Sequence, residues 1–259
     1  MRALLKALLL PLLLAMLHVP SPASAEEIVL GLSQAEVSIT TNFDGSEILV
    51  YGAVKRESAI PPGPELEVVL TIAGPSRPVM VRRKEKRFGI WLNTDAVEVD
   101  RAPSFYAVVT SGPIHEVLKR IEDLRHKISI PRAIRSVGAP MNISDSPSFT
   151  EALIRIRTRA GLYQVVEDGV KVDEQTLFRA AVRLPAALTE GEYATRIFLT
   201  RRGNVVAQYE TTIDVRKVGL ERWLFNLSRE NALLYGLMSL ALAIAAGWGA
   251  SAIFGMLRR

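Results

Sequence analysis

The sequence predicts a mainly β protein: two immunoglobulin-like β-sandwich modules joined by an amphipathic helix, followed by one C-terminal transmembrane helix. Short runs of alternating or β-branched residues, separated by turn residues, fill 26–112 and 148–219, a pattern typical of β-sandwiches. Helical periodicity lies between them, and Ala232–Leu257 contains no charged residue. A helix of these 26 residues measures about 39 Å, more than the roughly 30 Å hydrocarbon core of a bilayer.

Residues 1–25 have the composition of a secretory signal peptide. A positively charged start precedes the apolar run Leu8–Leu17 and the small-residue cleavage site Ala23-Ser24-Ala25. The alternative is an uncleaved second membrane helix, which the prolines and the short apolar run argue against. Export followed by arrest at the apolar helix predicts that 26–231 lie on the far side of the membrane and that Arg258-Arg259 form a cytoplasmic tail.

The first sandwich module is expected over 26–112. Its strands show the period of two of half-buried β-structure, and turn residues such as Asn42–Gly45 and Pro61–Pro64 separate them. The predicted strands are 37–40, 47–52, 65–72, 78–83, 89–93 and 104–110.

Residues 113–147 are predicted to form an amphipathic helix and a linker. Pro113 suits a first helical turn, and Pro131 follows the end of the pattern. Six apolar residues share one helical stripe, which we expect to pack on a sheet or to bridge the two modules: Ile114, Val117, Leu118, Ile121, Leu124 and Ile128.

The second sandwich module is expected over 148–219, with strands at 152–158, 163–167, 177–184, 193–200 and 205–215. Tyr193 after Gly191 is typical of a late strand in immunoglobulin-like domains. Residues 220–231 are predicted to form a juxtamembrane helix continuous with the transmembrane helix 232–257, with Trp223 at the level of the lipid headgroups.

Small residues recur at every fourth position of the apolar helix: Ser239, Ala243, Gly247, Ser251 and Gly255. Small side chains permit the close backbone approach on which helix association in lipid depends. We therefore predict a packing surface for a polytopic membrane protein or for a second copy of the chain. The alternative is the general abundance of Gly and Ala in membrane helices.

The densest charge cluster consists of Arg82, Arg83, Lys84, Lys86 and Arg87. It is a candidate docking site for an anion, for phospholipid headgroups or for an acidic partner. The alternative is a solvated hairpin tip that protects an edge strand. A second candidate is the alternating set Arg155, Arg157 and Arg159, which an exposed strand face explains equally well.

Several kinds of chemistry have no support in the sequence. The chain has no cysteine, so disulfides, thiolate catalysis and Cys-ligated zinc are excluded. His115 and His126 would lie about 16 Å apart on one helix, and Glu122 with His126 offers only two metal ligands. We therefore expect no metal, no cofactor and no catalytic residue. Loss of two cations with the signal peptide lowers the net charge from +5 to +3, and the remaining spread of charge argues against a nucleic-acid partner.

Five segments resemble a known family: Phe43–Gly45, Leu49–Val54, Arg82–Asn93, Pro103–Val108 and Lys217–Glu221. The similarity is to the alphaproteobacterial putative transmembrane protein family, and it covers nearly the whole chain. It implies a signal peptide, an exported region and one C-terminal helix, and therefore a bacterial inner-membrane protein with 26–231 in the periplasm. It implies no activity. It also suggests a partner class, the TauE/SafE-like anion exporters.

These observations predict a non-enzymatic accessory or interaction subunit of a polytopic membrane protein, such as an anion exporter. The alternative is a periplasmic module that binds an anion or an envelope component. A third reading is an enzyme whose residues converge only in three dimensions. A deep basic pocket favours the second reading, and a cleft with carboxylates and a histidine favours the third.

Overall fold

The computed structural model describes residues 26–34, 36–39, 43–56, 60, 63–138, 143, 145–218 and 220–257. The predicted signal peptide and the predicted tail, Arg258-Arg259, lie outside these residues. Within them the protein is mainly β, with three sheets, one of which is a curled half-barrel, and a C-terminal apolar helix. At this level the predicted fold class is confirmed.

The first sheet has four antiparallel strands in the order β1-β3-β10-β9. β10 illustrates why these sequences form strands, because its residues are alternately exposed and buried from end to end. The sheet thus has one face in the core and one in solvent. The strands are β1 (Glu27–Leu32), β3 (Ser46–Lys55), β9 (Val170–Asp173) and β10 (Leu177–Leu184).

The second sheet has six strands in the order β2-β12-β11-β4-β7-β8. β4 and β7 are nearly continuous apolar runs that are buried on both faces, as expected for strands covered on two sides. The strands are β2 (Glu36–Ile39), β4 (Glu67–Ala73), β7 (Tyr106–Thr110), β8 (Tyr163–Val166), β11 (Gly191–Arg201) and β12 (Asn204–Lys217).

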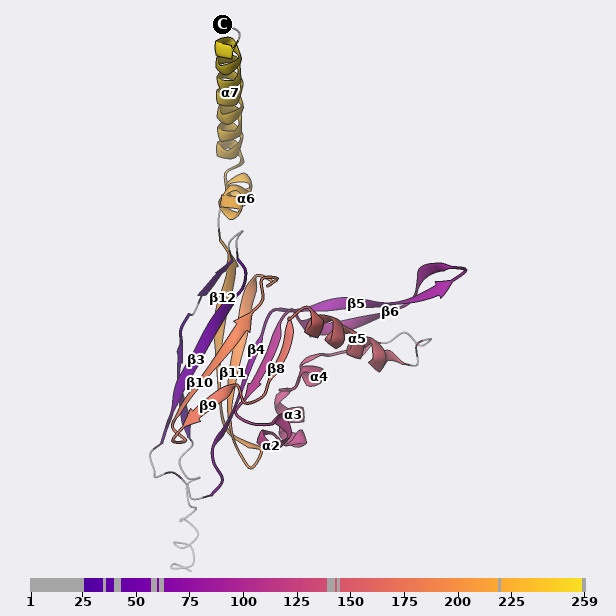
Figure 1. Cartoon of the computed structure of the whole chain (residues 1–259), viewed down its shortest axis with the longest axis vertical. Coiled ribbons are helices and arrows are strands. Elements are labelled where there is room, and N and C mark those ends of the chain that lie inside the picture. The colour runs from indigo at the N-terminus through magenta and orange to yellow at the C-terminus, as the bar shows by residue number, and fades with distance from the viewer. Residues whose placement is uncertain are drawn as a thin grey trace, which may run out of the picture.

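Two apolar cores hold three layers together (Figure 1). The first core lies between the two sheets, where Ile48 and Val50 of β3 join Leu70 and Ile197 of the six-stranded sheet. The second lies on the outer face of the six-stranded sheet, under four short helices. These are α2 (Ile114–Val117), α3 (Arg120–His126), α4 (Ile130–Ala133) and α5 (Ser146–Arg159).

The remaining sheet is a long hairpin, which we call the arm, made of β5 (Ser76–Arg87) and β6 (Ile90–Pro103). Its base is anchored in the second core by Val81, Val97 and Val99. Its distal part extends beyond α5 and away from the body (Figure 1).

The prediction of two separate sandwiches is wrong. Strands from the two halves of the chain pair with each other: β10 pairs with β3, and β11 pairs with β4. Each half contributes to both sheets, and one core lies between them. Two modules of this size would each bury little surface, whereas the interleaved sheets share one larger core.

The single helix predicted over 114–128 is also wrong. It breaks at Leu118, whose backbone is extended (φ −143°, ψ 120°), and the Lys119 N–H donates to the carbonyl of Gly203 (2.9 Å) in the β11–β12 turn. The break rotates α3, so Ile121 and Leu124 of the predicted apolar stripe are exposed.

The strand predicted at 152–158 is a helix. The alternation of Ile and Arg there suggested β-structure, but Phe149 and Leu153 are the buried residues of α5, at the i, i+4 spacing of a helix. Pro147 lies in the first turn, which suits a helix start.

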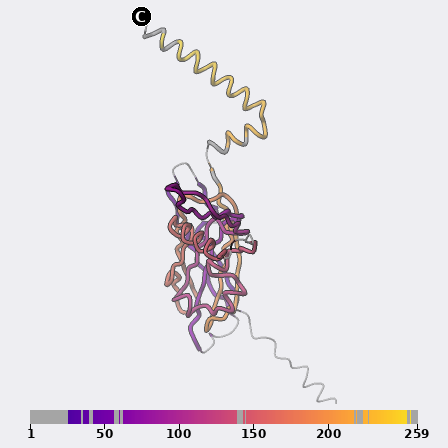
Figure 2. Tube along the Cα trace, turned by 90° about the vertical axis from the view of Figure 1, so that its right-hand side faces the viewer, coloured from indigo at the N-terminus to yellow at the C-terminus, as the bar shows by residue number. Residues whose placement is uncertain are grey.

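The C-terminal helices are α6 (Leu220–Glu230) and α7 (Ala232–Leu257). Asn231 separates them, and the chain bends there (Figure 2), so the prediction of one continuous helix is wrong. Among the described residues, one stretch is long and apolar enough to cross a membrane, Ala232–Ser251 of α7.

Candidate anion-binding cleft

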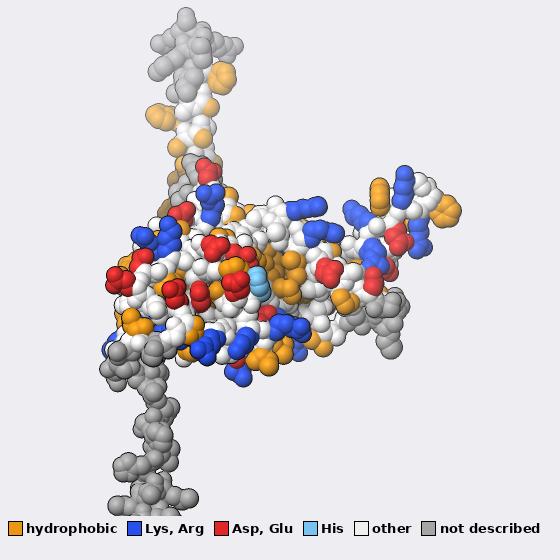
Figure 3. Space-filling model, turned by 60° about the horizontal axis from the view of Figure 1, so that its bottom comes forward, with side chains coloured by type: hydrophobic (Ala, Val, Ile, Leu, Met, Phe, Trp, Pro, Cys, Tyr) orange, Lys and Arg blue, Asp and Glu red, His pale blue; other side chains and the backbone are white. Residues whose placement is uncertain are grey.

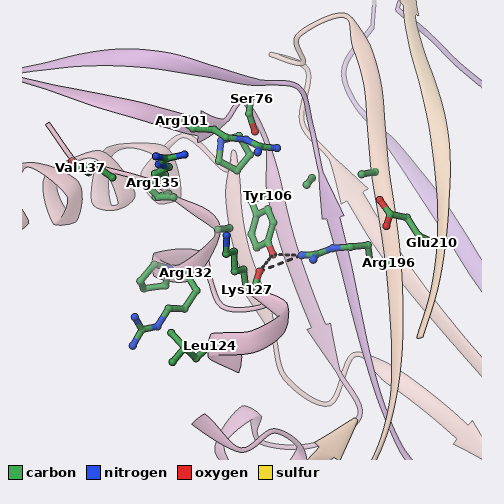
Figure 4. A pocket seen from close by; sticks show the side chains of 17 residues that line it. Ser76, Arg101, Tyr106, Leu124, Lys127, Arg132, Arg135, Val137, Arg196 and Glu210 are labelled. Atoms are coloured by element: carbon green, nitrogen blue, oxygen red, sulfur yellow. Dashed lines mark hydrogen bonds between the residues drawn. The ribbon is translucent and has the colours of Figure 1, made fainter. Parts of the chain in front are cut away.

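A cleft of about 660 Å³ opens on the outer face of the six-stranded sheet, where the helical layer stops short of β11 and β12 (Figure 4). One wall comes from α3, α4 and the segment Ile134–Val137, and the other comes from β11 and β12. The base of the arm closes the cleft through Ser76 and Arg101. The volume suits a small organic ligand.

Arg196 of β11 forms one side of the cleft floor. Its guanidinium donates to the carbonyl oxygens of His126 (2.8 Å) and Lys127 (3.2 Å) and to the Tyr106 hydroxyl (3.2 Å). All three acceptors are neutral, so the hydrogen bonds orient the side chain without cancelling its charge. The carbonyls are available because Lys127 ends α3 in the left-handed conformation (φ 52°).

Tyr106 holds this arrangement rigid. The ring is buried, and its hydroxyl donates to the carbonyl of Ile128 (2.8 Å). Burial raises the pKa of Tyr106, and this outweighs the opposing charge of Arg196. The phenol therefore stays protonated at neutral pH and acts as a hydrogen-bond donor.

Arg101 and Arg135 lie at the other end of the cleft, where their backbones are paired (Figure 4). They form an isolated antiparallel bridge, with N–H to carbonyl hydrogen bonds of 3.1 and 2.9 Å in the two directions. Residues opposite each other in such a bridge present their side chains on one face, and like charges there are destabilising. Asp100 lies near Arg135, and its pKa is lowered first by the N–H of Val137 and also by the charge of Arg135. An anion bound between the two arginines would relieve their repulsion.

The cleft has an excess of positive charge. Its lining includes one carboxylate, Glu210, and five cationic side chains, Arg101, Lys127, Arg132, Arg135 and Arg196. None of the five forms an ion pair with a carboxylate in the part of the chain that the structure describes. Glu210 lies directly across from Arg196 in the β11–β12 register, and Arg132 points outward at the rim (Figure 4).

The other lining residues are mixed in character. Leu124, Pro131 and Ile134 give apolar surface, and the buried hydroxyl oxygen of Ser136 has no hydrogen-bond partner within the described residues. Arginine donors with a free hydroxyl suit an oxyanion, and the apolar wall suits an organic body attached to it.

Sequence reasoning missed this cleft. Its cations come from β6, the end of α3, α4, the segment after α4 and β11, so no sequence spacing connects them. One signal was available in the sequence: Arg196 lies within the mostly apolar run Tyr193–Leu199, in a predicted strand. A charged residue in such a strand predicts a partner or a site.

The predicted basic cluster lies on the arm, and the structure divides its members between two roles. Arg83 is bound where the arm passes α5: it forms ion pairs with Asp145 (2.5 Å) and with Asp95 of β6 (3.7 Å), and it lies 4.6 Å from the centre of the Phe149 ring. The hydrogen bond to Asp145 raises the pKa of Arg83, and it lowers that of the carboxyl.

The other members of the cluster are exposed. Arg87 forms an exposed ion pair with Glu85 (3.2 Å). Arg82, Lys84 and Lys86 follow one another on a single exposed face of β5, and none is in an ion pair with another described residue. The cluster is therefore separate from the cleft.

The other candidates are dispersed. The small residues of α7 lie on one ridge, where Ser239, Ala243, Gly247 and Ser251 are exposed. Arg157 is directed inward, where it donates to the carbonyl of Pro103 and to the Tyr163 hydroxyl (2.9 Å). Its position at the arm's base makes its role structural.

His126 lies 3.5 Å from the buried Glu122, whose carboxylate also pairs with Arg125 (2.9 Å). In the described residues, no group of three or more His, Asp or Glu side chains is placed to hold a metal ion.

These features define a β-rich protein with one C-terminal candidate membrane span. The chain belongs to the family described as "Putative transmembrane protein (Alph_Pro_TM)", which it matches over residues 27–256. The family resemblance predicted from the five segments is therefore confirmed. No curated protein matches the chain.

Proposed function

We propose that the protein is a membrane-tethered, non-enzymatic module that binds an organic oxyanion in the cleft between α3–α4 and β11–β12. The observation that carries the proposal is the set of five cations against one carboxylate around a cavity of about 660 Å³. Unpaired cations repel one another, and a ligand of opposite charge removes that cost. The proposal corresponds to the alternative given by the sequence, an anion-binding module, but its binding site is the cleft and not the basic cluster of the arm.

The ligand class follows from the lining. Arginine presents a planar fork of donors that matches a carboxylate or a phosphate. Arg101 and Arg135 at one end and Arg196 at the other favour a ligand with at least two negative charges. The cleft lining contains no histidine, and the hydrogen bonds of Arg196 serve binding rather than proton transfer.

The tether supports a role at the envelope. α7 is the candidate span, and the predicted signal peptide would deliver the body to the periplasmic face. The cleft then samples anions of that compartment or of the membrane surface, which share the same oxyanion chemistry.

Binding can be tested on the full chain in nanodiscs of neutral lipid. Isothermal titration with pyrophosphate and with citrate should show saturable binding. Arg101→Gln with Arg135→Gln should weaken it at least tenfold, because hydrogen bonds to charged groups contribute about 1.5–3 kcal/mol each. The same double variant should unfold no more easily than the parent, since it removes a like-charge pair.

Arg183→Gln is the matched control. Arg183 is exposed on the solvent face of β10, so its loss should leave binding unchanged. Equal weakening by Arg183→Gln would reduce the effect to general charge. Absence of binding to both soluble anions, together with binding to vesicles that contain phosphatidylglycerol, would assign the cleft to lipid headgroups. No binding in either arm refutes the proposal.

A second candidate function is that of an accessory subunit of a polytopic membrane protein. The observation in its favour is the exposed ridge of small residues on α7. Binding of an anion and attachment to a transporter of anions are compatible roles.

A further inference from the structure

The end of the arm exposes large apolar side chains. Phe88 is 104 % exposed and Trp91 is 67 % exposed, and Ile90 and Leu92 beside them are also exposed. Figure 3 shows hydrophobic side chains at the end of the arm, with Lys and Arg side chains beside them and acidic side chains nearer the body. Such a cluster contributes nothing to the core and marks an interaction surface.

The backbone conformation of the turn at the end of the arm also supports an interaction surface. Phe88 and Gly89 both have positive φ (51° and 85°), a two-residue turn that normally takes Asn-Gly or Asp-Gly. Phenylalanine in the left-handed region is costly, and the fully exposed ring of Phe88 gains no packing within the protein that would offset this cost. An outside contact for the ring would offset that cost.

Cations stand directly behind the apolar end. Lys86 lies opposite Trp91 and Lys84 lies opposite Asn93 in the arm's register. Aromatic and aliphatic groups in front of lysines and arginines are the composition of segments that rest in an anionic bilayer surface. The two lysines are two positions apart in β5 and lie on the same exposed face, so both can reach headgroups.

The arm leaves the body in the part that is closer to α6 and α7 (Figures 1 and 2). It runs sideways from the body, with its end turned slightly toward the level of α6 (Figure 1). The ion pair of Arg83 with Asp145, at the start of α5, ties the middle of the arm to the body, and the end of the arm projects beyond this contact. Tethering by α7 keeps the local concentration of bilayer surface high.

We propose that the arm is a second membrane contact, which inserts Phe88, Ile90, Trp91 and Leu92 into the interface of an anionic bilayer while Lys84 and Lys86 bind the headgroups. The occupant is the same membrane that α7 crosses. A protein partner or a second copy of the chain is the competing outcome.

The test uses the full chain with Trp223→Phe and Trp248→Phe, so that Trp91 is the remaining tryptophan. In nanodiscs that contain phosphatidylglycerol and lipids brominated near the glycerol end of the acyl chains, Trp91 fluorescence should be quenched. Lys84→Gln with Lys86→Gln should reduce the ratio of inserted to free arm about fivefold for each lysine, which corresponds to about 1 kcal/mol per residue near the surface. High salt should have the same effect.

Tyr51→Trp, in a chain whose own three tryptophans are Phe, is the matched control, because Tyr51 is exposed on the body's four-stranded sheet. It should not be quenched. Equal fluorescence of Trp91 in brominated and ordinary anionic bilayers overturns the proposal. The competing outcome is that Trp91 is shielded from water without being quenched by the brominated lipids. If this shielding increases with the number of chains per bilayer, the arm contacts a second copy of the chain.

Discussion

A buried charged clamp ties the two sheets together and gives a direct test of the fold's energetics. Glu26, which precedes β1, accepts hydrogen bonds from Arg56 Nε after β3 (2.8 Å) and from Arg201 Nη2 at the end of β11 (2.9 Å). None of the three side chains is more than 13 % exposed. We define these residues as the clamp and predict that substitution of Glu26 destabilises the body strongly.

The magnitude follows from the groups left behind. Removing one partner of a buried ion pair costs about 3–5 kcal/mol, because the remaining charge is uncompensated. Arg56 and Arg201 keep neutral acceptors, the carbonyls of Gln175 and Pro64, so Glu26→Ala should cost about 3 kcal/mol. Glu26→Gln keeps an acceptor oxygen and should cost about 1–3 kcal/mol, which is large against a total of roughly 5–15 kcal/mol.

The effect should depend on pH in a defined direction. Burial raises the pKa of Glu26, but the hydrogen bonds and charges of Arg201 and Arg56 outweigh it, and the pKa is lowered overall. A carboxyl with a lowered pKa stabilises the fold above its unfolded value of about 4.3, and this contribution is lost as the pH falls through the folded value. The difference in free energy of unfolding between the parent and Glu26→Gln should thus be largest at pH 7 and should disappear in acid.

This difference can be measured by urea unfolding of the full chain in detergent micelles, monitored by far-ultraviolet circular dichroism. The matched control is Glu27→Gln, which removes the neighbouring ion pair with Lys55 (2.8 Å), both of whose side chains are more than 60 % exposed. Exposed pairs contribute about 0–1 kcal/mol. Equal midpoints for the two glutamine variants would refute the claim that the clamp is a buried, stabilising triad.

Three further predictions concern the arm, the apolar helix and the topology. Arg83→Ala should lower the free energy of unfolding more than Arg87→Ala in the same urea assay, because it loses Asp145, Asp95 and the Phe149 ring; equal values contradict the structural role of Arg83. Gly247→Leu should weaken helix association by about 1 kcal/mol in a membrane two-hybrid assay while insertion is unchanged, and unchanged association would leave α7 as a tether alone. A reporter fused after Arg259 should be active only in the cytoplasm, and periplasmic activity would contradict the predicted topology.

Local patterns predicted local structure well. β10 was identified from its alternation because the sheet has one buried and one solvated face, and such a strand displays its period in the sequence. α7 was identified because lipid demands a long apolar run. In both cases one environment acts along the whole element.

Pairing between distant segments could not be predicted. Nothing in β3 specifies β10 as its neighbour, since any strand with an apolar face would satisfy its inner face. The alternation in 152–158 predicted a strand, but the contact of Phe149 and Leu153 with the second core makes the stretch a helix. The cleft depends on the same pairing, because β6 and β11 must meet the end of α3 before their arginines converge.

The arm and the cleft are neighbours, and this sets how the two proposals relate. The base of the arm supplies Ser76 and Arg101 to the cleft wall, so a contact of the arm's end with the bilayer also fixes the direction in which the cleft faces. A single membrane contact through α7 would let the body turn, whereas two contacts would restrain it. A soluble anion should bind equally well with the arm free or inserted, because it arrives from all directions. A headgroup can enter only when the cleft is turned to the surface, so its binding should fall in Lys84→Gln with Lys86→Gln although neither lysine lines the cleft. Comparing the two ligands in that variant separates a soluble anion from a lipid one.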